Sequence, residues 1–162
     1  MKNVIVPRER FVLSPNRNRI GFSARILLVH HSGGPADAEA LVEWMATRAA
    51  KVSYHLSIGK RGDLWQSVPL NQRGWHAGES EYFGEESVNG FAIGVALCND
   101  GYSPFTEPQL ETLGKVQHLI GLPLVGHREV CQPEGRKPDP HDGFPWERFR
   151  PHLPHRTRLV SI

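Results

Sequence analysis

The run Ile26-Leu27-Leu28-Val29 constrains the fold most, because it is apolar at every position and ends in His30-His31. A strand that is apolar on both faces lies inside a sheet that is covered on both sides. Residues 91–98 form a second run of this kind. We therefore expect two central strands, over residues 25–31 and 91–98, with covering layers on each face of the sheet.

Helical and strand patterns alternate along the rest of the chain. Thr106 with Gln109 three residues later, and Pro108 in the first turn, predict the start of a helix that ends at Gly121. An earlier helix over residues 36–51 places four residues on one stripe: Leu41, Trp44, Met45 and Arg48. Further strands are predicted over residues 53–58, 64–68 and 124–127, the first two as a hairpin.

This alternation predicts one α/β domain with a central mixed β-sheet flanked by helices. We assign residues 25–162 to the domain. Residues 1–24 are expected to be an N-terminal extension that packs on the domain and contains an Asn/Pro turn. Contact between this extension and a substrate is the alternative.

Composition excludes several classes of protein. With 162 residues, the chain can bury about 70% of its unfolded surface around one core. Its net charge of +2 is too small to predict nucleic-acid binding. No stretch approaches the ~20 apolar residues of a membrane span, and the N-terminus has no signal-peptide pattern. The two cysteines, Cys98 and Cys131, do not make a disulfide framework.

Two imidazoles and one carboxylate stand where the fold can bring them together. His30 and His127 each follow an apolar strand, and Asp139 lies on a loop that Pro138 and Pro140 restrain. A catalytic zinc takes three protein ligands and keeps a fourth position for water, and imidazole and carboxylate both suit it. The sequence therefore predicts a Zn²⁺ site with His30, His127 and Asp139 as ligands.

Other assignments stay open on these residues alone. Adjacent residues of a strand face opposite ways, so only one of His30 and His31 can point at the site. Cys131 lies four residues after His127 and ranks behind Asp139 as the third ligand. The chain has nine histidines, so a chance cluster and a purely structural His30 are alternatives.

Six short segments stand in a characteristic order between about residues 25 and 150. They are Leu28-Val29-His30-His31-Ser32, Tyr54-His55-Leu56, Trp75-His76-Ala77-Gly78, Ile93-Gly94-Val95, Gly126-His127-Arg128-Glu129 and Lys137-Pro138-Asp139-Pro140, the last followed by Phe144-Pro145-Trp146. In this order they resemble the type 2 N-acetylmuramoyl-L-alanine amidase family. That family includes phage endolysins, peptidoglycan recognition proteins and a bacterial amidase that recycles muropeptides.

The resemblance implies hydrolysis of the amide that joins N-acetylmuramic acid to L-alanine in bacterial peptidoglycan. In the family, the first histidine of the strand-end pair binds zinc, which selects His30 over His31. The later histidine corresponds to His127. The third ligand, two residues after a lysine, corresponds to Asp139 after Lys137. Residues 25–162 are accordingly expected to be a zinc amidase domain.

The resemblance also implies roles for nearby residues. Some members assist the attacking water with a glutamate where this chain has Ala96, and others use a tyrosine that corresponds to Tyr54. We therefore expect Tyr54 to hydrogen-bond the water and Lys137 to stabilise the negative charge that develops during the reaction. Three further residues are expected to contact the substrate: Trp75, His76 and His31.

The expected function is that of a phage-type endolysin, made in the cytoplasm and acting as a monomer on the cell wall after release. Peptidoglycan is the expected partner, with no nucleic acid and no membrane insertion. One alternative is a non-catalytic peptidoglycan-binding module, which the complete ligand set disfavours. The other is a cytosolic recycling amidase, which the absent signal peptide suits and Ala96 disfavours.

Overall fold

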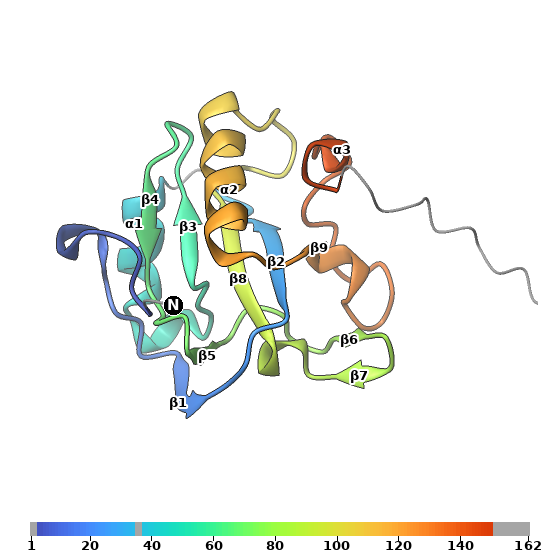
Figure 1. Ribbon diagram of the computed structural model, residues 1–162, viewed down its shortest axis with the longest axis horizontal. Helices are drawn as coiled ribbons and strands as arrows, with labels where there is room; N and C mark the ends of the chain where they lie inside the picture. The colour runs from blue at the N-terminus through green and yellow to red at the C-terminus, as the bar shows by residue number, and fades with distance from the viewer. Residues whose placement is uncertain (1–2, 35–36, 151–162) are drawn as a thin grey trace, which may run out of the picture.

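A five-stranded mixed sheet forms the centre of the computed structural model, which describes residues 3–34 and 37–150 (Figure 1). In spatial order its strands are β4 (Leu64–Gln66), β3 (Leu56–Ile58), β8 (Ala92–Leu97), β2 (Ile26–His31) and β9 (Leu124–Gly126). β3, β8, β2 and β9 run parallel, and β4 is antiparallel to β3. The expected α/β fold with a mixed central sheet is therefore confirmed.

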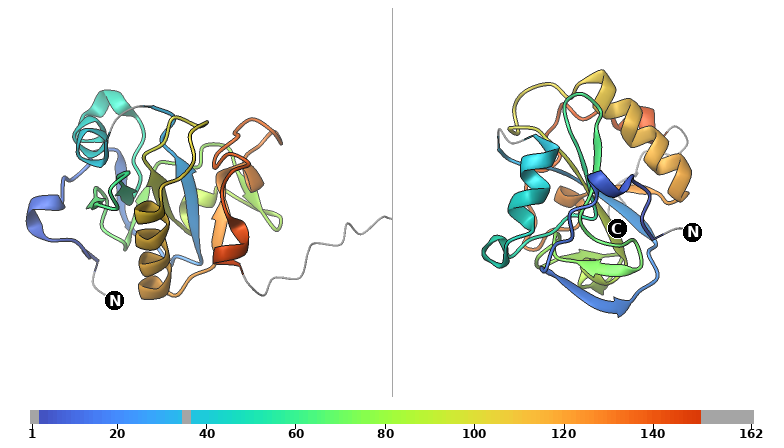
Figure 2. Two further views of the ribbon diagram at one scale, coloured as in Figure 1. Left: turned by 90° about the horizontal axis from the view of Figure 1, so that it is seen from above. Right: turned by 90° about the vertical axis from the view of Figure 1, so that its left-hand side faces the viewer.

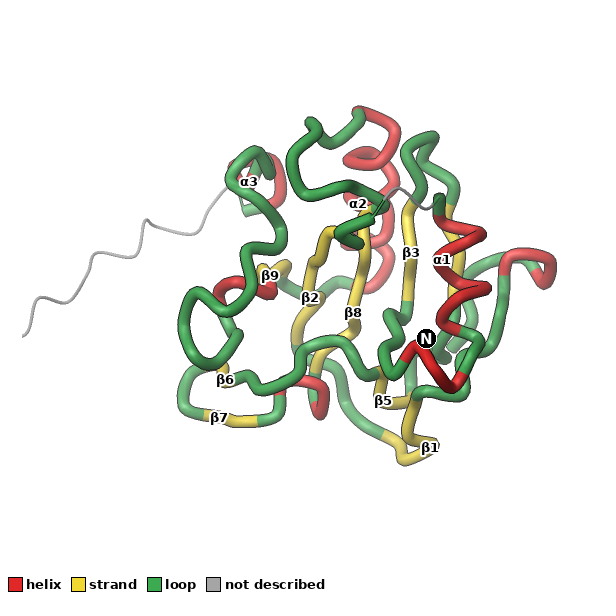
Figure 3. The backbone as a smooth tube through the Cα atoms, turned by 180° about the vertical axis from the view of Figure 1, so that it is seen from behind, coloured by secondary structure: helices red, strands yellow, loops and turns green. Residues whose placement is uncertain are grey.

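Helices cover the two faces of this sheet, as the views from above and from behind show (Figures 2 and 3). On one face α2 (Glu107–Ile120) packs over alternate residues of the central strands, including Leu27, Val29 and Val95. On the other face α1 (Ala38–Met45) packs against Ala96 and Cys98. On this face Ile26 and Leu28 of β2 pack against Ala77, Val88 and Val130 instead, so β2 and β8 are covered, and apolar, on both sides.

The strand register places small and polar groups beside the end of β2. His30 pairs with Ala96 of β8, and Ala96 pairs with Ser57 of β3. Side chains of directly paired residues project from the same face, so these three form a row across the sheet. Because parallel strands end at one edge, His30 and the residue after β9, His127, come to the same edge.

Helix α2 has the predicted ends. The side chain of Thr106 accepts from the backbone N–H of Gln109, and the Gln109 side chain accepts from the backbone N–H of Thr106 at 3.1 Å. Gly121 ends the helix with φ of +74°, a conformation that glycine adopts without steric cost. The capping pattern in the sequence therefore fixed both boundaries correctly.

Helix α1 is shorter than the predicted helix over residues 36–51, and its first predicted residue, Ala36, lies outside the described residues. The helix begins after Asp37, whose carboxylate accepts from the N–H of Ala40, and it ends at Met45 because Thr47 is extended. The predicted stripe is correct for Leu41 and Met45, which are buried, and wrong for Trp44, which is 50% exposed. The buried face consists of Ala38, Leu41, Val42 and Met45.

The N-terminal residues pack along the sheet's β4 side. Val12 donates a backbone hydrogen bond to Gln66, and β1 (Arg17–Gly21) pairs with β5 (Gln72–Gly74). The chain bends at Pro15 and Asn16, as expected, and the strand that begins at Arg17 gains a partner that local sequence does not reveal.

The remaining elements are short and were not predicted. They are the hairpin β6 (Glu81–Tyr82) and β7 (Glu85–Glu86), helix α3 (Trp146–Phe149), and 3-10 turns at Arg8–Arg10, Arg48–Ala50, Val88–Gly90 and His127–Glu129. The predicted end of the domain, residues 151–162, lies outside the described part of the chain. Within that part, no helix has the length and apolar character needed to cross a bilayer.

Candidate active site

Three side chains meet at the edge where the parallel strands end. His30 ends β2, His127 follows β9, and Asp139 arrives on the loop behind them. His30 Nδ1 lies 3.1 Å from His127 Nδ1 and 2.8 Å from Asp139 Oδ2, and His127 Nδ1 lies 3.0 Å from the same oxygen. We call His30, His127 and Asp139 the acid–imidazole cluster; its members are 1%, 3% and 7% exposed.

The hydrogen bonds around the cluster leave its inner atoms as acceptors. His127 Nε2 lies 2.9 Å from the carbonyl oxygen of Ala77, so Nε2 carries the proton and a neutral His127 presents a bare Nδ1. His30 Nε2 lies 3.3 Å from His76 Nδ1, so the same arrangement holds when His30 donates to His76. Lone pairs of two nitrogens and one carboxylate oxygen then converge on a common point.

A small cation bound between these three acceptor atoms would remove the repulsion between their lone pairs. Tetrahedral zinc with bonds of about 2.0–2.1 Å places its ligand atoms about 3.3 Å apart, close to the spacing found here. Burial lowers the pKa of His30 to about 4, against the opposing effect of Asp139, so its imidazole is neutral. Burial acts against ionisation of Asp139, but the adjoining His127 and His30 rings hold the pKa of this carboxyl below its usual range. Neutral imidazole and ionised carboxylate are the forms that bind metals.

A second layer of residues supports His30 from inside the sheet. The ring of His76 lies so close to Gly94 that a Cβ added there would be 2.6 Å from it. Behind it, His55 Nδ1 accepts from the N–H of Gly94 at 3.0 Å, and His55 Nε2 donates to the carbonyl of Gln72 at 2.8 Å. Burial, then the nearby His30 and His55 rings, holds the pKa of His76 well below its usual value.

Sequence reasoning missed this second layer. Its signal was Gly94, a glycine inside an apolar strand, which marks a close approach by another group. His76 was expected at the substrate; it borders the pocket but is only 6% exposed, with its ring packed between His30 and Gly94. A contact between His76 and substrate stays a prediction.

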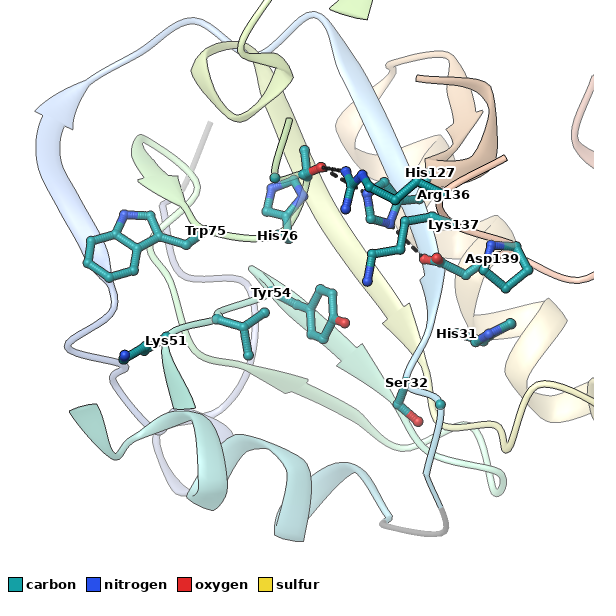
Figure 4. A pocket seen from close by; sticks show the side chains of 15 residues that line it. His31, Ser32, Lys51, Tyr54, Trp75, His76, His127, Arg136, Lys137 and Asp139 are labelled. Carbon is teal, nitrogen blue, oxygen red and sulfur yellow. Dashed lines mark hydrogen bonds and ion pairs between the residues drawn. The ribbon is translucent and has the colours of Figure 1, made fainter. Parts of the chain in front are cut away.

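Tyr54 lies beside the cluster. Its ring centroid is 4.9 Å from that of His30, and its hydroxyl points into the pocket (Figure 4). Burial, and then the Asp139 carboxylate, raises the pKa of Tyr54 well above its usual value. The hydroxyl is therefore protonated over the whole physiological range and can donate a hydrogen bond.

A pocket of about 370 Å³ opens beside the cluster. Lys137 and Arg136 border it near His127, while Lys51 and Trp75 border it at the other end (Figure 4). Trp75 is 37% exposed, and its Nε1 donates to Asn18 Oδ1 at 2.8 Å. The pocket therefore joins the cluster to an exposed indole that residues of the N-terminal extension help to position.

The structure also places the rival ligands. His31 is half-buried at the rim of the pocket, with its ring 5.8 Å from that of His141, and it takes no part in the cluster. Cys131 is buried with its sulfur facing the backbone carbonyls of Arg128 and Lys137. Among the described residues, only His30, His127 and Asp139 form a group able to hold a metal ion.

A buried cluster of two imidazoles and one carboxylate beside an open pocket is an arrangement that metal-dependent hydrolases use. The chain belongs to the N-acetylmuramoyl-L-alanine amidase family, whose model matches residues 20–142. The resemblance seen in the sequence is therefore confirmed.

Known proteins share this fold and part of the sequence. The 1,6-anhydro-N-acetylmuramyl-L-alanine amidase AmpD of Escherichia coli (strain K12) is 34% identical over 124 residues, which cover 72% of this chain and 67% of AmpD. The AmpD of Enterobacter cloacae is 41% identical over 99 residues, which span only 52% of its length. A crystal structure of a selenomethionine AmpD derivative superposes with a TM-score of 0.76 at 28% identity, covering 93% of this chain and 97% of that one.

Proposed function

We propose that this protein hydrolyses the amide bond between N-acetylmuramic acid and L-alanine, using a zinc ion held by His30, His127 and Asp139. The convergence of two imidazole nitrogens and a carboxylate oxygen within 3.1 Å of one another carries this proposal. Membership of the amidase family supports the choice of bond.

Zinc in such a site supplies a water whose pKa is lowered to about 7 and a positive charge that polarises the scissile carbonyl. The remaining work falls to residues at the pocket. Tyr54, which stays protonated, donates a hydrogen bond to the attacking water or to the oxygen that gains negative charge. The Lys137 ammonium borders the same space and stabilises that charge.

Ala96 supports the assignment to Tyr54. Ala96 pairs with His30 in register and packs under α1, so this position offers no carboxylate to the water. Tyr54 packs against the same apolar group that contains Ala96, and its hydroxyl is free to face the pocket. We therefore assign to Tyr54 the hydrogen bond to the reacting water.

The form of the substrate has two candidates. The combination of Tyr54 with Ala96 favours a wall-degrading endolysin, which acts on intact peptidoglycan after release from the cell. Similarity to AmpD, whose name specifies a 1,6-anhydro-muramyl substrate, favours soluble fragments instead. A binding module without activity is disfavoured by the complete cluster.

One experiment separates these functions. The purified protein is assayed for metal content, then incubated with intact peptidoglycan and, separately, with soluble anhydro-muramoyl peptide, and new L-alanine amino termini are counted. We expect about one zinc per chain, with amino termini appearing only when zinc is present and returning on its readdition after chelation. Termini released from both preparations after complete zinc removal would contradict the mechanism. Binding without release would assign the binding module.

A further inference from the structure

Two of the assigned ligands are carried by segments that meet at Gly126, the last residue of β9. A methyl group built on Gly126 would lie 3.0 Å from Glu129 Oε2, 3.0 Å from a ring carbon of Trp146 and 3.2 Å from the ring of Pro140. Gly126 directly precedes His127, and Pro140 directly follows the carboxylate ligand. A group that fixes this junction therefore acts on both ligands at once.

The carboxylate of Glu129 closes the turn after β9. Its Oε2 accepts from the backbone N–H of Gly126 at 2.6 Å, so the contact spans His127. The same turn reaches the third ligand, because the N–H of Arg128 donates to the carbonyl oxygen of Asp139 at 2.8 Å. One short turn thus carries His127 and is bonded to the backbone of Asp139.

Arg150 holds the Glu129 carboxylate in place. Its two terminal nitrogens lie 2.6 Å and 3.1 Å from the two carboxylate oxygens, the paired geometry that makes such contacts strong. Its Nε donates at 2.8 Å to the carbonyl of Leu124, where β9 begins, and its guanidinium lies 3.6 Å from the centre of the Trp146 ring. We call Arg150, Glu129 and Trp146 the arginine clamp.

A second arginine nearby makes a similar pair with a different neighbour. The terminal nitrogens of Arg148 lie 2.9 Å and 2.6 Å from the two carboxylate oxygens of Glu107, in the first turn of α2. This pair ties α3 to α2, whereas the arginine clamp ties the end of α3 to β9 and to the turn that follows it. Partly exposed ion pairs of either kind add little to overall stability. The importance of Arg150 therefore lies in what it holds.

We propose that Arg150 is a positioning residue for the metal centre, which acts through Glu129 to fix the turn that carries His127 and is bonded to Asp139. The inference rests on the proposed function, in which these residues bind zinc. A turn that is free to move must be ordered when its ligand binds, and the entropy lost in ordering weakens binding. Because the arginine clamp orders the turn when the protein folds, that loss no longer falls on the binding step.

The test measures the binding of zinc itself. Wild-type protein, Arg150→Met and Arg150→Lys are stripped of metal, and the dissociation constant for zinc is measured by competition with a chromogenic chelator. Arg148→Met is the matched control, because it breaks an ion pair of the same chemistry only two residues away. Methionine keeps an apolar stem beside Trp146, and lysine keeps the charge but loses the paired contact.

We expect the zinc dissociation constant to rise about tenfold in Arg150→Met, at the lower end of the roughly 10–100-fold range for groups that orient metal ligands from outside. Arg150→Lys should fall between wild type and Arg150→Met, and Arg148→Met should stay within twofold of wild type. An unchanged dissociation constant in Arg150→Met would overturn the proposal.

Urea unfolding with and without zinc separates positioning from general support of the fold. Bound zinc stabilises the folded protein by an amount that falls as its dissociation constant rises. If Arg150 positions the ligands, the rise in urea midpoint on adding zinc is smaller in Arg150→Met than in wild type. If Arg150 only supports the fold, the variant is weakened equally with and without zinc, as expected for Arg148→Met, and the proposal is rejected.

Assays of L-alanine release on the same proteins keep this inference distinct from the proposed function. If Arg150→Met binds zinc more weakly but wild-type protein releases no L-alanine amino termini, the amidase proposal fails and the positioning role stands. If wild type releases them with zinc and Arg150→Met binds zinc as tightly as wild type, the amidase proposal stands and the role of Arg150 is rejected. A wild-type protein that binds no zinc rejects both.

Discussion

The acid–imidazole cluster borders the same pocket as Lys51, Val52 and Trp75, which we call the Lys51 end, but the two are built in different ways. The cluster is buried and stands on the ends of central strands β2 and β9, which the surrounding core holds in register. Lys51 is exposed on a turn after a three-residue 3-10 helix, and the side-chain amide of Asn16 donates to the carbonyls of Thr47 and Val52 on either side of it. Asn16 precedes residue 20, where the match to the amidase family begins.

The difference separates chemistry from recognition. Ligands need fixed positions within fractions of an ångström, which a packed sheet edge provides. Side chains that recognise the rest of a substrate can shift slightly as it binds, and exposed turns allow such movement. Changes at the cluster should therefore lower the rate of bond breaking or remove the metal, whereas changes at the Lys51 end should alter substrate affinity.

His127→Ala should have the largest effect. It removes one inner acceptor of the cluster, and the loss should exceed the roughly 10–100-fold change expected for a residue outside the ligand shell. Zinc content and kcat are measured together, with His118→Ala on exposed α2 as the control. Full activity in His127→Ala, with zinc retained, would reject the ligand assignment.

Lys137→Met should come next. Loss of a charge that stabilises the transition state lowers kcat by about 10²–10³-fold with little change in KM. Lys137→Arg should recover part of this loss, because the charge is kept. If Lys137→Met changes only KM, Lys137 serves substrate binding and does not stabilise the transition state.

The second layer predicts a pH dependence of folding. Burial lowers the pKa of His55 to about 4, so this ring is neutral in the folded protein and accepts from Gly94. The unfolded chain binds the proton below about pH 6.5, so stability falls as the pH drops from 6.5 towards 4, by about 3 kcal/mol in all.

His55→Gln removes this titration. The free energy of unfolding, measured by urea titration of chelator-treated protein at pH 7 and pH 4.5, should depend less on pH in the variant than in wild type. Equal pH dependence in the two proteins would mean that His55 is charged or exposed in the fold.

Gly94→Ala should have a smaller effect that still reaches the cluster. The added methyl would lie 2.6 Å from the His76 ring, which contacts His30. Overpacking of this kind destabilises by about 1–3 kcal/mol. Zinc affinity, measured by chelator competition, should also weaken, whereas Gly90→Ala, where no atom lies within 4 Å of the new methyl, should leave it unchanged.

Asn18→Ala should have the smallest effect and should act at the Lys51 end. Loss of the Asn18–Trp75 hydrogen bond costs about 1 kcal/mol or less at this exposed position. We expect KM to rise a few-fold with kcat unchanged, and Asn71→Ala to serve as the neutral control. A fall in kcat would show that the two ends are coupled.

The sequence predicted the central strands and helix α2 correctly, because these elements depend on residues that are close together in the chain. The apolar runs fixed β2 and β8, and the Thr106–Gln109 capping pair fixed α2. The three residues expected as ligands also meet in the structure, because parallel strands must end at one edge. Their roles, and those of Tyr54 and Lys137, stay predictions until metal and activity are measured.

Features that depend on contacts between distant segments were missed. Asn16 was expected only as part of a turn. Its side-chain amide also donates to backbone carbonyls more than 25 positions along the chain, which only the fold brings near. Trp44 was expected to be buried because the predicted stripe continued to Arg48. The helix ends at Met45, and its buried face is centred on Leu41 and Val42 instead. The contact between His76 and Gly94 also requires the sheet to exist first.

The row Ser57–Ala96–His30 across the sheet has a consequence for how such enzymes change over time. In the described part of the chain, the buried Ser57 hydroxyl has no hydrogen-bond partner, and Ala96 of β8 lies between Ser57 and His30 in the row. A single replacement, Ala96→Glu, would introduce a carboxyl group with a donor already waiting on one side and the imidazole on the other. A chain that already has Tyr54 would then offer a carboxylate at the same site after one substitution.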